Sequence, residues 1–156
     1  MESLKLLDGL VDVYLPDFKY ADRLLSKRYG AREDYPTVAF DALKEMLRQQ
    51  PKTIFDKYGV VKKGVIVRHL VLPDCLDNTK EVLKILAKIN KNLYVSLMAQ
   101  YLPMGKASEF ENLCRSLTQE EYDQAVEYFF DAGLKNGFSQ EISSAEECFV
   151  PEFNRL

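Results

Sequence analysis

A continuous apolar run between Gly64 and Pro73 dominates the hydrophobic pattern of the chain. The run is rich in β-branched side chains, which is typical of a buried strand in a parallel sheet. Because side chains alternate along a strand, Arg68 lies on one face and His69 on the other. A guanidinium buried without a partner costs several kcal/mol. We therefore expect Arg68 to have a function and His69 to be a hydrogen-bonded structural histidine that faces a covering helix.

Three further segments have the pattern of short strands, each ended by polar or turn-forming residues. They span residues 11–15, 93–98 and 138–142. Residues 53–61 suggest a small hairpin that is inserted before the central strand. These segments alternate with stretches of helical periodicity, so the pattern predicts an α/β fold with a parallel sheet.

Turn and capping residues mark where the three main helices begin. Pro36 fits the first turn of one helix. Asn78 with Glu81, and Thr118 with Glu121, have the spacing of capping boxes at the start of the other two. The helix after Pro36 is expected to turn the following inner stripe toward the sheet: Val38, Ala42, Leu43, Met46 and Leu47.

About four strands cannot close an eight-stranded barrel, for which roughly 200 residues or more are typical. Two architectures remain: a complete doubly wound sheet, or a partial (β/α) barrel of TIM type that is truncated on its N-terminal side. The helical segment at residues 2–8 has no cap in front of it. This favours the partial barrel, with residues 1–156 forming one half-barrel domain.

Composition narrows the possible partners and location. The chain of 156 residues has 47% hydrophobic residues, enough for a real core, and a net charge of −3. It has no clustered lysines and arginines of the kind that bind nucleic acid, and no apolar run long enough to span a membrane. The N-terminus has no signal-type pattern, so we expect a cytoplasmic protein without a nucleic-acid or membrane partner.

Polar side chains follow two of the expected strands. Asp17 and Lys19 come after residues 11–15 and share one face if the chain is extended, and Gln100 follows residues 93–98. Ligands of parallel sheets collect at the carboxyl ends of the strands. In the plainer alternative, Asp17 and Lys19 form a solvated ion pair and Gln100 satisfies backbone groups at the edge of the sheet.

Four motifs occur in a family-like order and spacing. They are Asp12-Val-Tyr-Leu-Pro-Asp-Phe-Lys-Tyr20, Arg68-His-Leu-Val-Leu-Pro73, Leu97-Met-Ala-Gln-Tyr101 and Gly137-Phe-Ser-Gln-Glu141. Together they resemble the C-terminal half of radical S-adenosylmethionine (radical SAM) proteins related to the pyruvate formate-lyase activating enzyme. The similarity covers essentially the whole chain and is strongest to an uncharacterised branch of that family.

The resemblance implies a partial (β/α) barrel in which S-adenosylmethionine lies across the strand ends and chelates a [4Fe-4S] cluster. Its reductive cleavage gives a 5′-deoxyadenosyl radical, which in activating enzymes abstracts a hydrogen from a glycine of a partner glycyl-radical enzyme. By the same match, Asp17, Lys19 and Arg68 become cofactor-binding candidates. Gln100 joins them through the Gln-Tyr pattern of the uncharacterised branch, which stands where the activating enzyme has a histidine. No catalytic residue or metal ligand is assigned.

The chain departs from the family at its iron-binding motif. A radical SAM cluster needs the spacing Cys-x-x-x-Cys-x-x-Cys, which leaves one iron open for the cofactor. The three cysteines here, Cys75, Cys114 and Cys148, are 39 and 34 residues apart and give no local cradle. We therefore expect reduced structural thiols and no cluster in this chain alone. The N-terminal half is expected to be missing because of an internal start, a split gene or expression of the C-terminal half alone.

Two other functions stay open at this point. The chain could be a non-enzymatic half-barrel module whose exposed sheet edge pairs with a partner chain or with its own copy. It could instead be a complete doubly wound domain that binds a nucleotide or small anion at Arg68 and Lys19. The latter is the weakest, because a glycine-rich phosphate loop is missing. The open sheet edge predicts self-association if the other half is not present.

Overall fold

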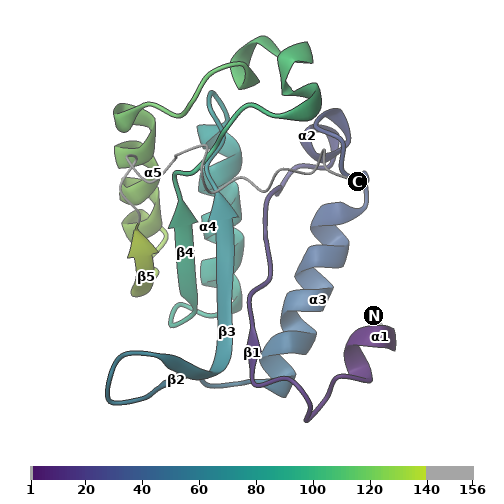
Figure 1. The fold of residues 1–156 in the computed structure, drawn as a ribbon, viewed down its shortest axis with the longest axis vertical. Coiled ribbons are helices and arrows are strands. Elements are labelled where there is room, and N and C mark those ends of the chain that lie inside the picture. Colours follow the sequence, from purple (N-terminus) through teal and green to yellow (C-terminus); the bar gives the residue numbers. More distant parts are fainter. Residues whose placement is uncertain (1, 140–156) are drawn as a thin grey trace, which may run out of the picture.

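A parallel sheet with helices on one side forms the centre of the molecule (Figure 1). The computed structural model describes residues 2–139. The strands are β1 (Val13–Tyr14), β2 (Ile54–Phe55), β3 (Val61–Leu70), β4 (Tyr94–Met98) and β5 (Asn136–Ser139). The α-helices are α1 (Glu2–Lys5), α2 (Arg23–Arg28), α3 (Tyr35–Gln49), α4 (Leu76–Ile89) and α5 (Gln119–Asp131). Two short 3-10 helices, η1 (Gly105–Glu109) and η2 (Glu111–Leu113), lie between β4 and α5.

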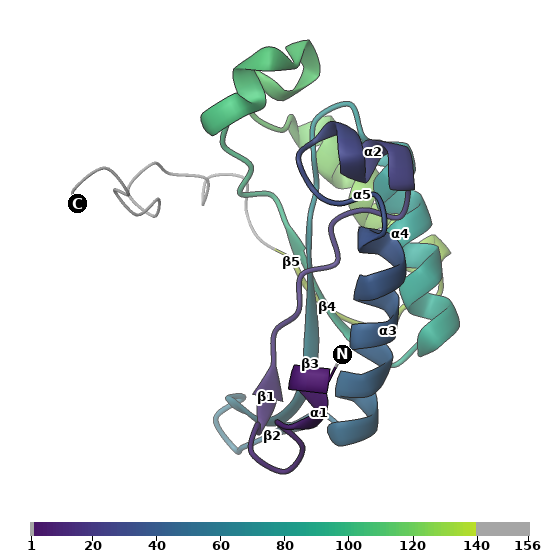
Figure 2. The ribbon, with the colours of Figure 1, turned by 90° about the vertical axis from the view of Figure 1, so that its right-hand side faces the viewer.

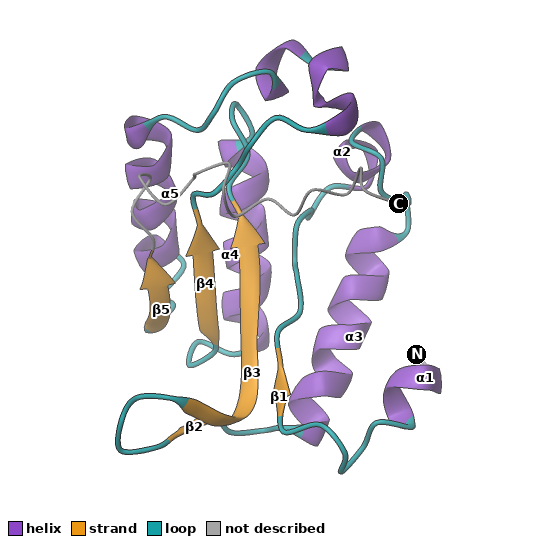
Figure 3. Cartoon of the chain, in the orientation of Figure 1, coloured by secondary structure: helices purple, strands orange, loops and turns teal. Residues whose placement is uncertain are grey.

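The strand order is β1-β3-β4-β5, and every neighbouring pair in this order is parallel. The hairpin strand β2 pairs antiparallel with the start of β3. Figure 3 shows that the carboxyl ends of β3, β4 and β5 point to one end of the molecule, where η1 and η2 gather. The α/β class, the parallel sheet of about four strands and the hairpin before the central strand are thus confirmed.

Helices α3, α4 and α5 all cover the same face of the sheet (Figure 2). The core on this face joins Val65 and Val67 of β3 to Leu43 of α3, Leu83 of α4 and Phe129 of α5. The first four of these side chains are at most 1% exposed, so the interior is closely packed. No helix covers the opposite face of the sheet in the described part of the chain, and we call it the helix-free face.

The alternation along β3 agrees with the sequence prediction. His69 is fully buried on the helix-covered face, whereas the Arg68 side chain is 44% exposed on the helix-free face. The strand itself ends at Leu70, three residues before Pro73. Because the Arg68 side chain is half-exposed to solvent, its charge avoids most of the desolvation cost that full burial would impose.

Two local predictions about helices are wrong. Helix α4 begins at Leu76 with Cys75 as its N-cap, so Asn78 lies inside the helix and does not cap it. Val38 is 51% exposed, whereas Phe40 packs against the core. By contrast, Thr118 forms the predicted capping box with Glu121 at the start of α5.

The remaining differences concern the ends of elements. Strand β1 has two residues and not five, although Asp17 adds an isolated parallel bridge to Arg68 further along. Strand β5 begins at Asn136, and the expected strand residues 140–142 lie outside the described residues. None of the helices in the described part of the chain combines the length and the apolar character that crossing a bilayer requires.

Gly64 occupies the crowded point where the hairpin joins β3. Its φ of +128° is rare for residues with a side chain, and an added Cβ would lie 2.5 Å from the Cα of Thr53. We expect Gly64→Ala to lower the free energy of unfolding by ~3 kcal/mol, because it adds both backbone strain and overpacking. Urea denaturation measures this loss.

Gly59 provides the matched control. It also has a positive φ, +79°, but nothing lies within 4 Å of the position of its Cβ. Gly59→Ala is expected to cost only about 1 kcal/mol, the penalty for the left-handed conformation alone. Equal losses in the two variants would show that the close approach of Thr53 is not what requires glycine at position 64.

Candidate functional site

Asp17 and Arg68 meet on the helix-free face. Main-chain hydrogen bonds from Arg68 N to Pro16 O and from Phe18 N to Arg68 O hold the two segments in parallel register. Arg68 then places both Nε and Nη2 at 2.8 Å from Oδ1 of Asp17. Half-exposed ion pairs of this kind add little stability. The pair therefore contributes little to holding the fold together, and it presents polar groups to solvent on this face.

Lys19 lies beside this pair and binds it loosely. Its Nζ is 3.8 Å from Oδ2 of Asp17, and its side chain is 47% exposed. Asp17, Lys19 and Arg68 together carry one negative and two positive charges, so the group has a net charge of +1. Three of the four predicted site residues are thus brought together, and Lys19 is the cation that a ligand can reach most easily.

Gln100 lies further along the sheet. Arg68 is paired in register with Ser96 of β4, and Gln100 follows Ser96 by four residues. At about 3.3 Å per extended residue, this offset is on the order of 13 Å along the strand direction. Gln100 therefore lies at the same end of the sheet but beyond the level of Asp17 and Arg68.

Two polar side chains from helices hold the backbone of residues 17–21. The Tyr35 hydroxyl donates a hydrogen bond to Asp17 O and accepts one from Lys19 N, both at 3.0 Å. The Asn78 side chain donates to Lys19 O and accepts from Ala21 N, both at 2.9 Å. This segment has no strand on its outer side among the described residues, so side chains supply the hydrogen bonds that a neighbouring strand would make.

His69 holds the same segment from beneath. Its Nδ1 is 2.8 Å from Phe18 O, and its Nε2 is 3.0 Å from Oγ1 of Thr79. Burial lowers the pKa of His69 to about 4, so the ring is neutral near pH 7 and one ring nitrogen accepts a hydrogen bond. The structure confirms the prediction of a hydrogen-bonded structural histidine facing a helix.

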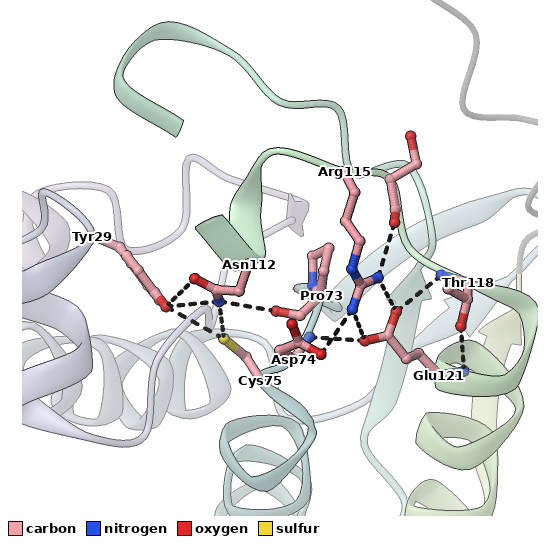
Figure 4. A network of polar contacts seen from close by, with 9 residues as sticks. Tyr29, Pro73, Asp74, Cys75, Asn112, Arg115, Thr118 and Glu121 are labelled. Carbon is pink, nitrogen blue, oxygen red and sulfur yellow. Dashed lines mark hydrogen bonds and ion pairs between the residues drawn. The ribbon is translucent and has the colours of Figure 1, made fainter. Parts of the chain in front are cut away.

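A second polar cluster lies in the loops at the carboxyl ends of the strands (Figure 4). Arg115 contacts Glu121 at 2.7 and 2.8 Å and Asp74 at 2.8 Å. The Arg115 guanidinium lowers the pKa of Glu121 to about 2. All three charges are paired within the cluster, which suits it to fixing the η2 segment to the starts of α4 and α5.

The other end of this cluster contains a cysteine. The amide of Asn112 contacts the Tyr29 hydroxyl at 3.0 Å, Pro73 O at 3.3 Å and Sγ of Cys75 at 3.7 Å. Burial raises the pKa of Cys75, which keeps it a protonated thiol rather than a nucleophilic thiolate. An open groove of about 710 Å³ runs beside the cluster, between α2, the start of α4 and η2.

The described residues do not provide an iron–sulfur site. Cys75 and Cys114 are free thiols, and Cys148 lies outside the described residues. Across residues 2–139, no group of three or more His, Cys, Asp or Glu side chains is arranged to hold a metal ion. These residues therefore do not fit a cluster that needs three thiolates.

Sequence reasoning missed Tyr35, Asn78 and the aromatic residues next to Asp17. Asn78 carried the signal of a helix cap. Tyr20 ends one of the four motifs but was given no role there, and Tyr35 lies outside these motifs. Their role depends on contacts between residues that are up to 59 positions apart. Local patterns in the sequence do not encode such contacts.

Comparison with known proteins gives one informative match. An uncharacterized protein of Methanocaldococcus jannaschii is 34% identical to this chain over 128 residues, which are 81% of this chain. The chain spans about a third of the length of that relative. No protein-family profile matches the chain, and no solved structure matches it.

The buried His69 makes folding depend on pH. Its pKa of about 4 in the folded protein lies below the value of 6.5 in an unfolded chain, so the unfolded state binds more protons between these values. We expect the free energy of unfolding to be fully retained above pH 6.5 and to fall by ~3 kcal/mol as the pH drops to 4. Urea denaturation at several pH values measures this slope.

His69→Gln is the control for this slope, because the chain has no other histidine. The variant should be less stable at pH 7, but its free energy of unfolding should change little between pH 6.5 and 4.5. Glu121, whose pKa is lowered to about 2, contributes a loss only at more acidic pH. A variant that keeps the wild-type slope would show that His69 does not cause it.

The hydroxyl of Tyr35 can be tested separately from its ring. Tyr35→Phe keeps the ring but leaves Asp17 O and Lys19 N without this partner. We expect a loss of about 1–2 kcal/mol in the free energy of unfolding. Tyr58→Phe, at a side chain that is 77% exposed, should stay within about 0.5 kcal/mol of the wild type. Similar values for both variants would contradict the proposed hold on residues 17–21.

Proposed function

We propose that this chain is the C-terminal half of a radical SAM protein of the activating-enzyme type, with a partial (β/α) barrel architecture and a cytoplasmic location. The observation that carries the proposal is the group of Asp17, Lys19 and Arg68 on the helix-free face of a parallel sheet. In a barrel with outer helices, the face without helices is the interior, where ligands bind near the carboxyl ends of the strands. The similarity to about a third of a longer relative also supports a part of a larger protein.

The charges of the site suit S-adenosylmethionine. Its carboxylate would bind the excess positive charge of Lys19 and Arg68, and its ammonium or ribose hydroxyls would bind Asp17. Gln100, further along the sheet, would offer an amide to a more distant part of the cofactor. When bound beside an iron–sulfur cluster, this cofactor supplies radical chemistry. The described residues do not hold a cluster, so we assign that task to the N-terminal half of the proposed protein.

A glycyl-radical enzyme is the proposed target, as the sequence resemblance suggests. The proposal includes no nucleic-acid or membrane partner, in line with the net charge of −3. Within this chain, Asp17, Lys19 and Arg68 bind and orient the cofactor. Tyr35, Asn78 and His69 position these residues without touching the cofactor.

The test is to mix this chain with an upstream polypeptide that carries Cys-x-x-x-Cys-x-x-Cys, reconstitute it with iron and sulfide, and measure S-adenosylmethionine binding. We expect binding in the mixture and little binding by either part alone. Lys19→Met should weaken binding about tenfold, since it removes one charged hydrogen bond. Lys63→Met, at a side chain that is 56% exposed near the hairpin, is the matched control and should have no effect.

Two results would reject this function. One is a mixture that assembles a cluster but does not bind S-adenosylmethionine. The other is tight cluster binding by this chain alone, because the account requires the cluster to come from elsewhere. The Lys63→Met control separates loss of the site from a general loss of positive charge.

A second candidate is a non-enzymatic module that uses the helix-free face for association. It is favoured by the large apolar side chains that remain exposed after β1, in the hairpin and on β5: Leu15, Ile54, Val60 and Phe138. Association of the chain alone in sedimentation, disrupted by Phe138→Glu and unaffected by Lys19→Met, would support this module. A chain that stays monomeric at high concentration would reject it.

A further inference from the structure

A small, open cavity lies on the side of α2 and α3 and shares Asp17 and Lys19 with the charged site. Its volume is about 360 Å³, and its lining includes Asp17, Lys19, Tyr20, Tyr29 and Tyr35. This volume is at the lower end of the range for pockets that bind small molecules, and it suits one compact ligand. The family resemblance assigns cofactor binding to Asp17 and Lys19, but it assigns no function to the three tyrosines that line the cavity with them.

Three of the residues that line the cavity are tyrosines. The rings of Tyr20 and Tyr35 pack edge to face with their centres 5.7 Å apart, and Tyr29 lies 6.5 Å from Tyr20. The hydroxyl of Tyr35 is engaged by the backbone at Asp17 and Lys19, and that of Tyr29 by Asn112. These hydroxyls are therefore held in place. Tyr20 is only 8% exposed, so the half-buried rings of Tyr29 and Tyr35 provide most of the surface for a planar group.

The charge at the cavity favours an anion. Arg68 neutralises Asp17 through its two contacts at 2.8 Å, which leaves the loosely held ammonium of Lys19 as the excess charge. The two acidic side chains of the loop between α2 and α3 have basic partners of their own. Glu33 pairs with Lys27, and Asp34 pairs with Arg32.

We propose that this cavity binds a small planar aromatic ring that carries an anionic group. The ring packs on Tyr20, Tyr29 and Tyr35, and the anionic group binds Nζ of Lys19. Two sources of this chemistry are a nucleoside monophosphate and an aromatic carboxylate. The inference goes beyond the proposed function, because it requires neither S-adenosylmethionine nor a cluster and concerns this chain alone.

The experiment titrates the chain with AMP and with benzoate while recording the tyrosine ring signals by NMR. The chain has nine tyrosines and no tryptophan, and Tyr→Phe variants assign the signals. We expect the signals of Tyr20, Tyr29 and Tyr35 to move, with a dissociation constant below about 1 mM for at least one of the two probes. The signal of Tyr94, which lies on β4, should not move.

Adenosine and inorganic phosphate test the two halves of the ligand. Each should bind at least about tenfold more weakly than AMP, because each lacks either the charge or the ring. Lys19→Met should weaken AMP and benzoate about tenfold, whereas Lys62→Met, 58% exposed at the start of β3, should leave both unchanged. Tighter binding of AMP would identify a nucleotide, and tighter binding of benzoate an aromatic carboxylate.

Several results would overturn the inference. They are equal binding of adenosine and AMP, equal binding of phosphate and AMP, movement of the Tyr94 signal in place of the three cavity tyrosines, or no binding of either probe below about 1 mM. Because the measurement uses this chain without cofactor or cluster, its failure would leave the proposed radical SAM function untouched. Success would likewise not establish that function.

Discussion

The hydrogen bonding of residues 16–18 along β3 is the constraint on which the rest of the site depends. The ladder between β1 and β3 is two residues long, and the chain then continues beside β3 through Pro16 O, Phe18 N and the bridge between Asp17 and Arg68. On the outer side of this segment, hydrogen bonds from Tyr35 and Asn78 replace those of a neighbouring strand. The His69 ring makes the hydrogen bond to Phe18 O. Because these groups come from α3, α4 and β3, the position of Asp17 and Lys19 is set by the whole helix-covered core.

The two faces of the sheet have different tasks. Valines, leucines and phenylalanines interlock with three helices on one face, where apolar burial drives folding. On the other face, Arg68 and Asp17 remain in contact with solvent, and a charged pair can be kept there without a large desolvation cost. Because side chains alternate along β3, the residues that stabilise the core and the residue that forms the charged site lie on opposite faces. The same ten residues of β3 thus hold the core and present the site.

Two cavities near the carboxyl ends of the strands differ in how far their charged groups are already paired within the protein. In the groove beside Arg115, the cationic and acidic groups of the cluster satisfy one another, and Cys75 is a buried thiol. This arrangement fixes loops. In the smaller cavity beside Lys19, aromatic rings form the walls and one cation is loosely held. A ligand gains more from the second arrangement, because fewer existing contacts must be broken.

The sequence by itself determined the features that depend on short-range geometry. Alternation in the apolar run put Arg68 and His69 on opposite faces, and the spacing of Thr118 and Glu121 specified the start of α5. The same kind of reasoning failed at Asn78, because an amide that fits a capping box also fits a hydrogen bond to a distant backbone. Inside α4 it contacts Lys19 and Ala21 instead.

Only the tertiary structure decided which distant groups meet. It paired Arg68 with Asp17 across 51 positions of sequence and left Lys19 as the excess charge. It also brought Tyr20, Tyr29 and Tyr35 around one cavity, although nothing in the sequence pattern connects these three residues. Periodicity and capping arise from interactions over about one helical turn or one strand pleat. Contacts between residues that are distant in the sequence depend instead on how complete helices and strands pack.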